Sequence, residues 1–143
     1  MPDIIAVAAD HGGYDLKVVL LAELRELGHT VLDLGTDGAA SVDYPDFADA
    51  LAVAIRDGRA QRGLLVCGSG IGMSIAANRH RWIRAALCHD GLTARLARAH
   101  NDANVLCLGG RLIGIEQAKD CLRTFFAAPF DGGRHQRRID KMC

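Results

Sequence analysis

Short apolar runs alternate with stretches of helical periodicity along the chain. The run 4–9 is unbroken, and Leu16, Leu20 and Leu24 after it recur at the spacing of one helix face. An unbroken short run is typical of a strand that is buried on both faces, whereas the wider spacing is typical of an amphipathic helix. Repetition of this pattern predicts strands at 4–9, 30–34, 63–66, 83–88 and 105–108, and helices at about 16–27, 46–55, 73–78, 91–99 and 115–126.

Five strands alternating with five helices predict an α/β fold. Connections between parallel strands are right-handed and place helices on both faces of the sheet. We therefore expect a three-layer αβα sandwich around a Rossmann-like, five-stranded parallel sheet. The length of 143 residues suits one domain with a core of its own, spanning 1–143.

Composition narrows the class of ligand. Lys+Arg and Asp+Glu each number 17, and hydrophobic residues make up 50% of the chain. No net charge would recruit nucleic acid or a membrane surface, so the expected ligand is a small molecule. The first apolar run is too short for a membrane span and has no basic segment before it, which predicts a cytoplasmic protein.

Cysteine usage indicates reduced thiols. The five cysteines, at 67, 88, 107, 121 and 143, show neither CxxC pairing nor the spacing of zinc ligands. Cys88, Cys107 and Cys121 lie in apolar runs and are expected in the core. Neither these cysteines nor the histidines predict a metal site.

The third predicted strand ends on a thiol followed by three closely spaced glycines, in the loop Cys67-Gly68-Ser69-Gly70-Ile71-Gly72. Glycines let backbone N–H groups approach a ligand closely, and the helix that follows presents its positive end to an anion. The same donors favour the thiolate form of Cys67, which would make it a base or nucleophile. Taken alone, the loop also fits a buried structural cysteine before an ordinary glycine turn.

The glycine spacing does not predict a nucleotide site. Gly68, Gly70 and Gly72 form G-x-G-x-G after the third strand. A dinucleotide fingerprint requires G-x-G-x-x-G after the first strand, and the chain has no G-K-[ST] of a P-loop.

Polar residues gather near the predicted strand ends. Ligands of such sheets bind outside the carboxyl ends of the strands, where the strand order reverses. Asp10 and His11 follow the first strand and Cys67 ends the third, so both groups lie at this edge. His100 and Asn101 precede the fifth strand and lie toward the opposite edge. A single chain is therefore not expected to bring His100 to Cys67, whereas a partner subunit could.

Three further residues have two interpretations each. Tyr44, before Pro45, is either a hydroxyl-bearing wall of the site or a packing residue. Arg134 and Arg138 are four apart and share a face if the tail is helical, so they could hold a phosphate. The alternative for this pair is a solvated basic tail.

As an ordered set, five motifs make the chain resemble the ribose-5-phosphate isomerase B family, also called the RpiB/LacAB sugar-phosphate isomerases. The resemblance covers nearly the whole chain, and Cys67 places it with the cysteine-base form. It implies one sugar-phosphate isomerase domain that needs no cofactor. The motifs are Ala9-Asp10-His11-Gly12-Gly13, Asp43-Tyr44-Pro45, Cys67-Gly68-Ser69-Gly70-Ile71-Gly72, His100-Asn101-Asp102-Ala103-Asn104-Val105 and Gly132-Gly133-Arg134-His135-Gln136.

The resemblance also implies a role for each site residue. Cys67 would move the proton between C1 and C2 of the sugar, His100 would assist opening of the furanose ring, and Ser69 would shuttle the hydroxyl proton. Asp10 and Tyr44 would contact the substrate's hydroxyls, and Asn101 would contact the developing charge. The enediolate would be stabilised by the amides of Gly68, Gly70, Ile71 and Gly72, and the phosphate would be held by His11, Arg111, Arg134 and Arg138.

The resemblance implies an aldose–ketose isomerase of ribose 5-phosphate and ribulose 5-phosphate. Its members work as homodimers with shared active sites, and assembly into a tetramer stays open. Some relatives isomerise galactose, allose or tetrulose phosphates with the same machinery, so another sugar phosphate is the alternative substrate.

The fold alone also permits two other classes of protein. One is a phosphate- or nucleotide-sensing module without catalysis, against which the set Cys67, Ser69 and His100 argues. The other is a thiol-redox protein, which would require a resolving cysteine close to Cys67, and none is adjacent in sequence.

Overall fold

The computed structural model describes residues 3–143; Met1 and Pro2, with which the predicted domain begins, lie outside the described residues. One sheet contains five strands in the order β2-β1-β3-β5-β4, and every neighbouring pair is parallel. The predicted α/β class and parallel sheet are thus confirmed. The strands are β1 (Ile4–Ala9), β2 (Thr30–Asp33), β3 (Arg62–Cys67), β4 (Ala85–Leu87) and β5 (Val105–Gly109).

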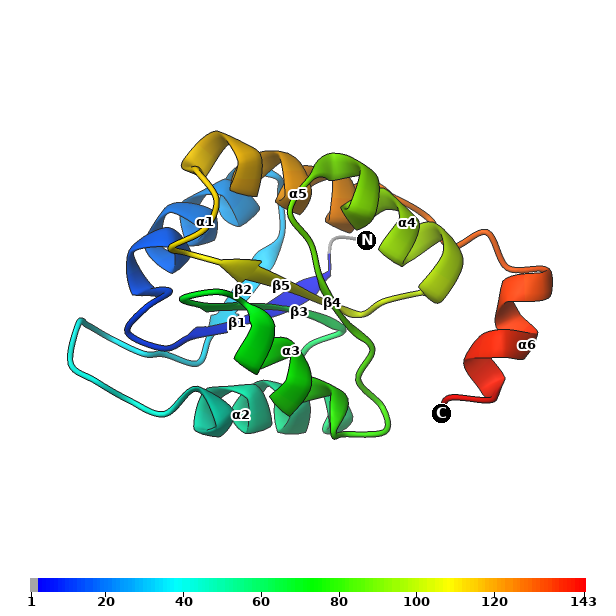
Figure 1. Ribbon diagram of the computed structural model, residues 1–143, viewed down its shortest axis with the longest axis horizontal. Helices are drawn as coiled ribbons and strands as arrows, with labels where there is room; N and C mark the ends of the chain where they lie inside the picture. The colour runs from blue at the N-terminus through cyan, green and yellow to red at the C-terminus, as the bar shows by residue number, and fades with distance from the viewer. Residues whose placement is uncertain (1–2) are drawn as a thin grey trace.

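Helices cover both faces of the sheet and complete the predicted three-layer sandwich (Figure 1). One face carries α1 (Tyr14–Glu26), α4 (Gly91–Asn101) and α5 (Ile115–Ala127), and the other carries α2 (Tyr44–Arg56) and α3 (Ile71–Asn78). Successive strand residues point to opposite faces. Leu64 and Val66 therefore join the apolar layer under α1, whereas Leu65 and Cys67 join the layer under α2 and α3.

The strand order reverses between β1 and β3, because β2 lies on one side of β1 and the later strands lie on the other. These two strands are neighbours although β2 separates them in sequence. Their carboxyl ends meet, and Asp10 N donates to Val66 O at 3.2 Å. Such a reversal point is where ligands bind in open parallel sheets.

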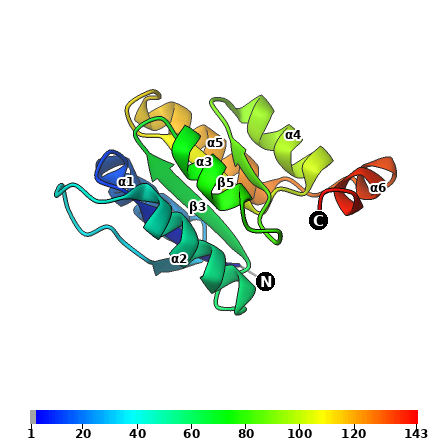
Figure 2. The same ribbon diagram turned by 60° about the horizontal axis from the view of Figure 1, so that its bottom comes forward.

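A sixth helix, α6 (Arg134–Asp140), occupies the segment predicted only as a basic tail, so the expected number of five helices is wrong. Its one buried residue is Ile139, at 4% exposure. A single buried position gives no apolar periodicity, which is why the sequence pattern missed this helix. Figures 1 and 2 show α6 projecting from the body of the molecule, beside the end of α4.

Most of the other predicted elements differ from the observed ones by one or two residues at an end, and two of these differences have a clear structural cause. The fourth helix was expected to stop at Ala99, but α4 continues through Asn101 and ends where Asp102 takes the left-handed conformation, with φ of 44°. The strand predicted at 83–88 is only three residues long, because the backbone of Arg84 pairs with Asn104 instead of extending the ladder. Among residues 3–143, no helix is long and apolar enough to cross a membrane.

Candidate active site

The loops that follow β1, β3 and β5 interlock at the carboxyl edge of the sheet. A Cβ added at Gly13 would lie 2.3 Å from Val66 O, and one added at Gly109 would lie 2.6 Å from Ser69 O. Any side chain at these glycines would collide with backbone, so the loops approach one another only because the side chains are absent. Backbone contacts therefore fix the walls of the site.

Cys67 is the last residue of β3 and is 4% exposed. Gly70 has φ of 78°, a conformation that favours glycine, and its N–H donates to Cys67 Sγ at 3.1 Å. An N–H donor at the start of a helix stabilises negative charge on sulfur. The Cys67 sulfur therefore has a backbone N–H donor aimed at it from the start of α3.

The other three buried thiols lie where burial disfavours a thiolate. Burial raises the pKa of Cys88 to about 11 and that of Cys121 to about 12, and it raises the pKa of Cys107 further. These three thiols stay protonated at neutral pH, as expected for core residues.

A cavity of about 630 Å³ opens over Cys67. It contains eight residues that the sequence predicts as site residues and two that it does not, Ile75 and Leu112. Ile75 follows Ile71 by one helical turn, so the two side chains share a face of α3 and are 60% and 50% exposed. The lining residues are Asp10, Tyr44, Cys67, Gly68, Ser69, Ile71, Gly72, Ile75, Arg111 and Leu112.

Asp10 and Tyr44 form two polar walls of this cavity. Asp10 is 7% exposed, and its Oδ1 accepts hydrogen bonds from Gly12 N at 2.9 Å and Gly13 N at 3.1 Å. The ring of Tyr44 lies against the first turn of α3, where a Cβ added at Gly72 would be 2.6 Å from Tyr44 Cε1. A glycine at position 72 is therefore required for the ring to take this place.

The remaining wall offers hydrogen-bond donors and one positive charge. Ser69 Oγ accepts from Ile71 N at 3.2 Å, and the N–H groups of the first turn of α3 have no partner within the helix. Arg111 crosses above Gly68, and among the described residues no carboxylate lies within 4.0 Å of its guanidinium. A helix N-terminus beside an unpaired guanidinium suits an anionic ligand.

His11 lies next to Asp10 but does not line the cavity in the described part of the chain. Its Nδ1 accepts from Val42 N at 3.2 Å, which ties the loop after β1 to the segment before α2. Its half-buried ring is thus held at the same edge of the sheet.

Four other predicted site residues lie elsewhere: among residues 3–143, the lining of the Cys67 cavity does not contain His100, Asn101, Arg134 or Arg138. Gly70, also predicted as a substrate-binding residue, is buried beside Cys67 and does not line the cavity either. The helix α4 starts after β4 at the carboxyl edge and returns to the opposite edge, so it carries His100 away from Cys67 (Figure 1). The prediction that one chain does not bring these two residues together agrees with this placement.

The end of α4 is joined to the tail. The rings of His100 and His135 stack with centroids 4.4 Å apart and 12° between their planes, and Asp131 N donates to Ala99 O at 2.9 Å. The pKa of His135 is lowered by partial burial and by the nearby charges of His100, Arg134 and Arg138. We call residues 98–102 and 128–138 the α4–α6 block.

The α4–α6 block holds one set of side chains with metal-ligand chemistry. The ligand atoms of His100, Asp131 and His135 all lie within 4.8 Å of one another. A metal ion binds in the plane of each imidazole ring at about 2.0–2.1 Å. Two parallel stacked rings cannot both meet that condition, so one ring would have to leave the stack before both could bind one ion.

Comparisons with known proteins show the family of this chain. A profile of the ribose/galactose isomerase family matches residues 5–142. The chain is 43% identical over 136 residues to ribose-5-phosphate isomerase B of Escherichia coli, covering 95% of this chain and 91% of that protein. It is 45% identical over 139 residues to D-erythrulose-4-phosphate isomerase of Pectobacterium atrosepticum, with coverage of 96% and 91%. A crystal structure of a ribose 5-phosphate isomerase from Thermotoga maritima superposes with a TM-score of 0.96 at 52% identity, covering 98% and 97% of the two chains. The chain therefore belongs to the ribose/galactose isomerase family, the RpiB family of sugar-phosphate isomerases, and is an aldose–ketose isomerase.

Proposed function

We propose that this isomerase interconverts D-ribose 5-phosphate and D-ribulose 5-phosphate through an enediolate, with Cys67 as the base. The observation that carries the proposal is the Cys67 thiol at the base of the cavity, with the Gly70 N–H 3.1 Å from its sulfur. A volume of about 630 Å³ lies in the range typical of small-molecule sites.

The position of Cys67 in this loop supports the following proton transfer. The thiolate of Cys67 removes the proton from C2 of the open-chain aldose, and the electron pair moves toward O1 to give the enediolate. The Cys67 thiol then gives a proton to C1, while Ser69 relays the hydroxyl proton from O2 to O1. A proton next to a carbonyl is weakly acidic, so donors aimed at the developing oxyanion are needed, and the amides of Gly68–Gly72 take this role.

The substrate's other groups are assigned to the remaining residues. Asp10 and Tyr44 contact the sugar hydroxyls, and Arg111 contributes positive charge for the phosphate. His11 and the partner's Arg134 and Arg138 hold the phosphate. The partner's His100 assists ring opening, and the partner's Asn101 contacts the developing charge.

We assign the partner as a second copy of this chain. Three apolar side chains at the rim of the cavity, Ile71, Ile75 and Leu112, are 50%, 60% and 59% exposed. A sugar phosphate offers little apolar surface to cover them, whereas the surface of another protein chain does. In a two-fold dimer the α4–α6 block of each chain reaches the Cys67 cavity of the other, which supplies the groups that one chain lacks.

A tetrulose phosphate is the second candidate substrate. It is favoured by the similarity to D-erythrulose-4-phosphate isomerase, which is as great as the similarity to ribose-5-phosphate isomerase B. The same machinery would also serve galactose 6-phosphate or allose 6-phosphate in a deeper cavity.

The substrate is tested by measuring kcat/KM over sugar phosphates of four, five and six carbons. We expect the largest value for ribose 5-phosphate and ribulose 5-phosphate. A larger value for a four- or six-carbon substrate would overturn the substrate assignment while leaving the enzyme class intact.

The base is tested with Cys67→Ser, because a hydroxyl is hardly ionised at neutral pH. We expect kcat to fall at least about a hundredfold. Cys143→Ser is the matched control at an exposed cysteine and is expected to leave turnover unchanged. Near-normal turnover of Cys67→Ser would refute the cysteine base.

A further inference from the structure

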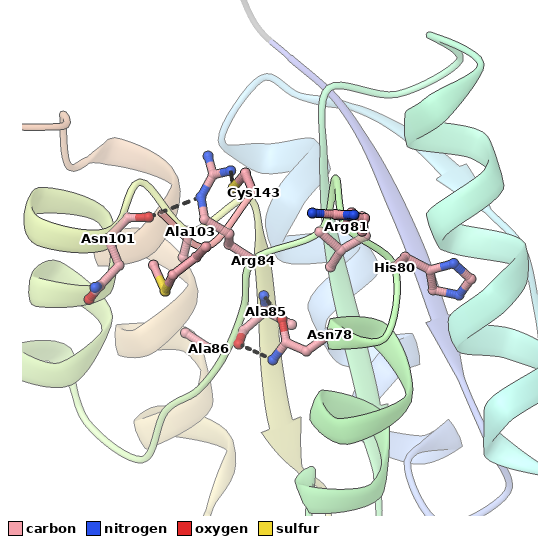
Figure 3. A pocket seen from close by; sticks show the side chains of 11 residues that line it. Asn78, His80, Arg81, Arg84, Ala85, Ala86, Asn101, Ala103 and Cys143 are labelled. Carbon is pink, nitrogen blue, oxygen red and sulfur yellow. Dashed lines mark hydrogen bonds between the residues drawn. The ribbon is translucent and has the colours of Figure 1, made fainter. Parts of the chain in front are cut away.

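Arg84 lies just before β4 and reaches across to the end of α4 (Figure 3). Its Nε donates to Asn101 O at 3.1 Å and to Asp102 O at 3.2 Å, and its Nη2 donates to Asp102 O at 2.9 Å. The last carbonyls of a helix have no partner within it, and a cation suits the negative end of the helix dipole. Arg84 therefore supplies hydrogen-bond donors to the carbonyls at the C-terminal end of α4.

Both ends of this contact are fixed. Arg84 N donates to Asn104 Oδ1 at 2.8 Å, and Asn104 N donates to Arg84 O at 3.0 Å. The carboxylate of Asp102 lies between two guanidiniums, with Oδ2 3.3 Å from Arg84 Nη2 and Oδ1 2.7 Å from Arg98 Nη1. Hydrogen bonds to Asn104 thus hold the backbone of Arg84, and ion pairs hold the carboxylate of Asp102 that its guanidinium contacts.

The same side chain also touches the end of the tail. Arg84 Nη1 donates to Cys143 Sγ at 3.3 Å, and Figure 3 shows the guanidinium between Asn101 and Cys143. Cys143 follows α6, so one side chain contacts the α4 end of the α4–α6 block and the chain beyond its tail. Arg84 is not among the residues that line the Cys67 cavity in the described chain.

We propose that Arg84 is a positioning residue that fixes the α4–α6 block, so that His100 and the tail arginines are presented to the partner's Cys67 cavity. This inference rests on the function proposed for that block. Arg84 acts through the backbone of Asn101 and Asp102 and does not touch the substrate.

Arg81 offers a matched control, because it and Arg84 both line a second cavity, of about 430 Å³. It is exposed, and among the described residues it makes no hydrogen bond or ion pair. In Figure 3 its side chain lies on the far side of the cavity from Asn101. Replacing it removes one arginine from the same surface without touching the end of α4.

The test uses the full-length variants Arg84→Met, Arg84→Lys and Arg81→Met with two measurements. The first is hydrogen exchange of the amides of Asp102 and Ala103, which bond to α4 carbonyls, with the Gly70 amide of the Cys67 loop as internal reference. The second is kcat/KM for ribose 5-phosphate.

We expect Arg84→Met to speed exchange at the end of α4 about tenfold or more without changing exchange at Gly70. We also expect it to lower kcat/KM about tenfold to a hundredfold, since small misplacements of catalytic groups have effects of that size. Arg84→Lys should lie between wild type and Arg84→Met, because an ammonium cannot reproduce the planar fork of donors. Arg81→Met should match wild type in both measurements.

Three results would overturn the proposal: unchanged exchange at the end of α4, faster exchange there with wild-type kcat/KM, or exchange that rises equally at Gly70, which would make Arg84 merely structural. If Arg84→Met does not fold, Arg84→Lys supplies both measurements. The exchange result stands apart from the proposed function, which fails separately if His100→Asn retains wild-type kcat/KM for ribose 5-phosphate.

Discussion

The Cys67 cavity and the α4–α6 block place chemical groups in contrasting ways. Cys67 is the last residue of β3 and follows the fully buried Val66. The loops around Cys67 contact one another through backbone atoms. The block lies at a helix end and in a tail, where α6 buries only Ile139 and the contacts run through side chains. The cavity is therefore held by the backbone of the sheet and its loops, whereas the block depends on a few side-chain contacts.

The largest expected effect separates the two regions by chemistry. Ribulose 5-phosphate has no furanose ring, because its 5-hydroxyl carries the phosphate, so exchange of its C1 proton with deuterium from D₂O needs Cys67 but not the ring-opening group His100. We expect Cys67→Ala to lower this exchange by about 10³-fold or more, while His100→Asn retains it. NMR of recovered ribulose 5-phosphate gives both rates. Equal loss of exchange in the two variants would erase the distinction between the regions.

The second effect concerns the wall of the cavity. Gly72→Ala places a methyl group where Tyr44 Cε1 would be 2.6 Å away, so the ring must move. We expect kcat/KM to fall about tenfold with little change in melting temperature, because a half-exposed side chain gives way more easily than backbone. Gly38→Ala is the control, since no atom lies within 4 Å of the added Cβ. Equal behaviour of the two variants would show that Tyr44 does not need its present place.

The third effect concerns the tail arginines. Arg138→Ala is expected to lower kcat/KM roughly tenfold to a hundredfold, because charge-assisted hydrogen bonds to phosphate contribute about 1.5–3 kcal/mol each. Arg137, the next residue on α6, points about 100° away and is the control. Equally small changes in kcat/KM for Arg137→Ala and Arg138→Ala would show that the tail is a solvated surface that does not bind the phosphate.

The smallest effect is a pH dependence within the block. The pKa of His135 is lowered in the folded protein, so the unfolded chain binds this proton more readily and stability falls as the pH drops below about 6.5. Melting temperatures at pH 8 and pH 5 should therefore differ more for wild type than for His135→Gln. An identical decrease in both proteins would assign the acid sensitivity to other groups.

The sequence predicts the cavity better than the block because the signals for the cavity are local. An apolar run that ends in Cys67 and a glycine-rich loop marks a strand end, and strand ends of a parallel sheet share one edge. Ile75 and Leu112 escaped prediction because an exposed apolar residue becomes informative only beside a cavity.

The block depends on contacts between residues far apart in sequence. Arg84 and Asp102 are 18 positions apart, and no periodic pattern links them. The helix α6 has too few buried residues to produce apolar periodicity, and the stack of His100 on His135 exists only once the tail has folded back onto α4. The sequence motifs include His100, Asp102 and His135 but not Arg84, and the arrangement of all four required the fold.

The central claim is that each active site joins the Cys67 cavity of one chain to the α4–α6 block of its partner. Hybrid dimers that carry Cys67→Ala in one chain and His100→Asn in the other, purified through two different tags, test this claim most directly. One site of the hybrid then combines the intact Cys67 with the intact His100, so we predict about half of the wild-type kcat per dimer for ribose 5-phosphate, although both parent homodimers are nearly inactive. A hybrid as inactive as its parents would place Cys67 and His100 of one site on the same chain and contradict the claim.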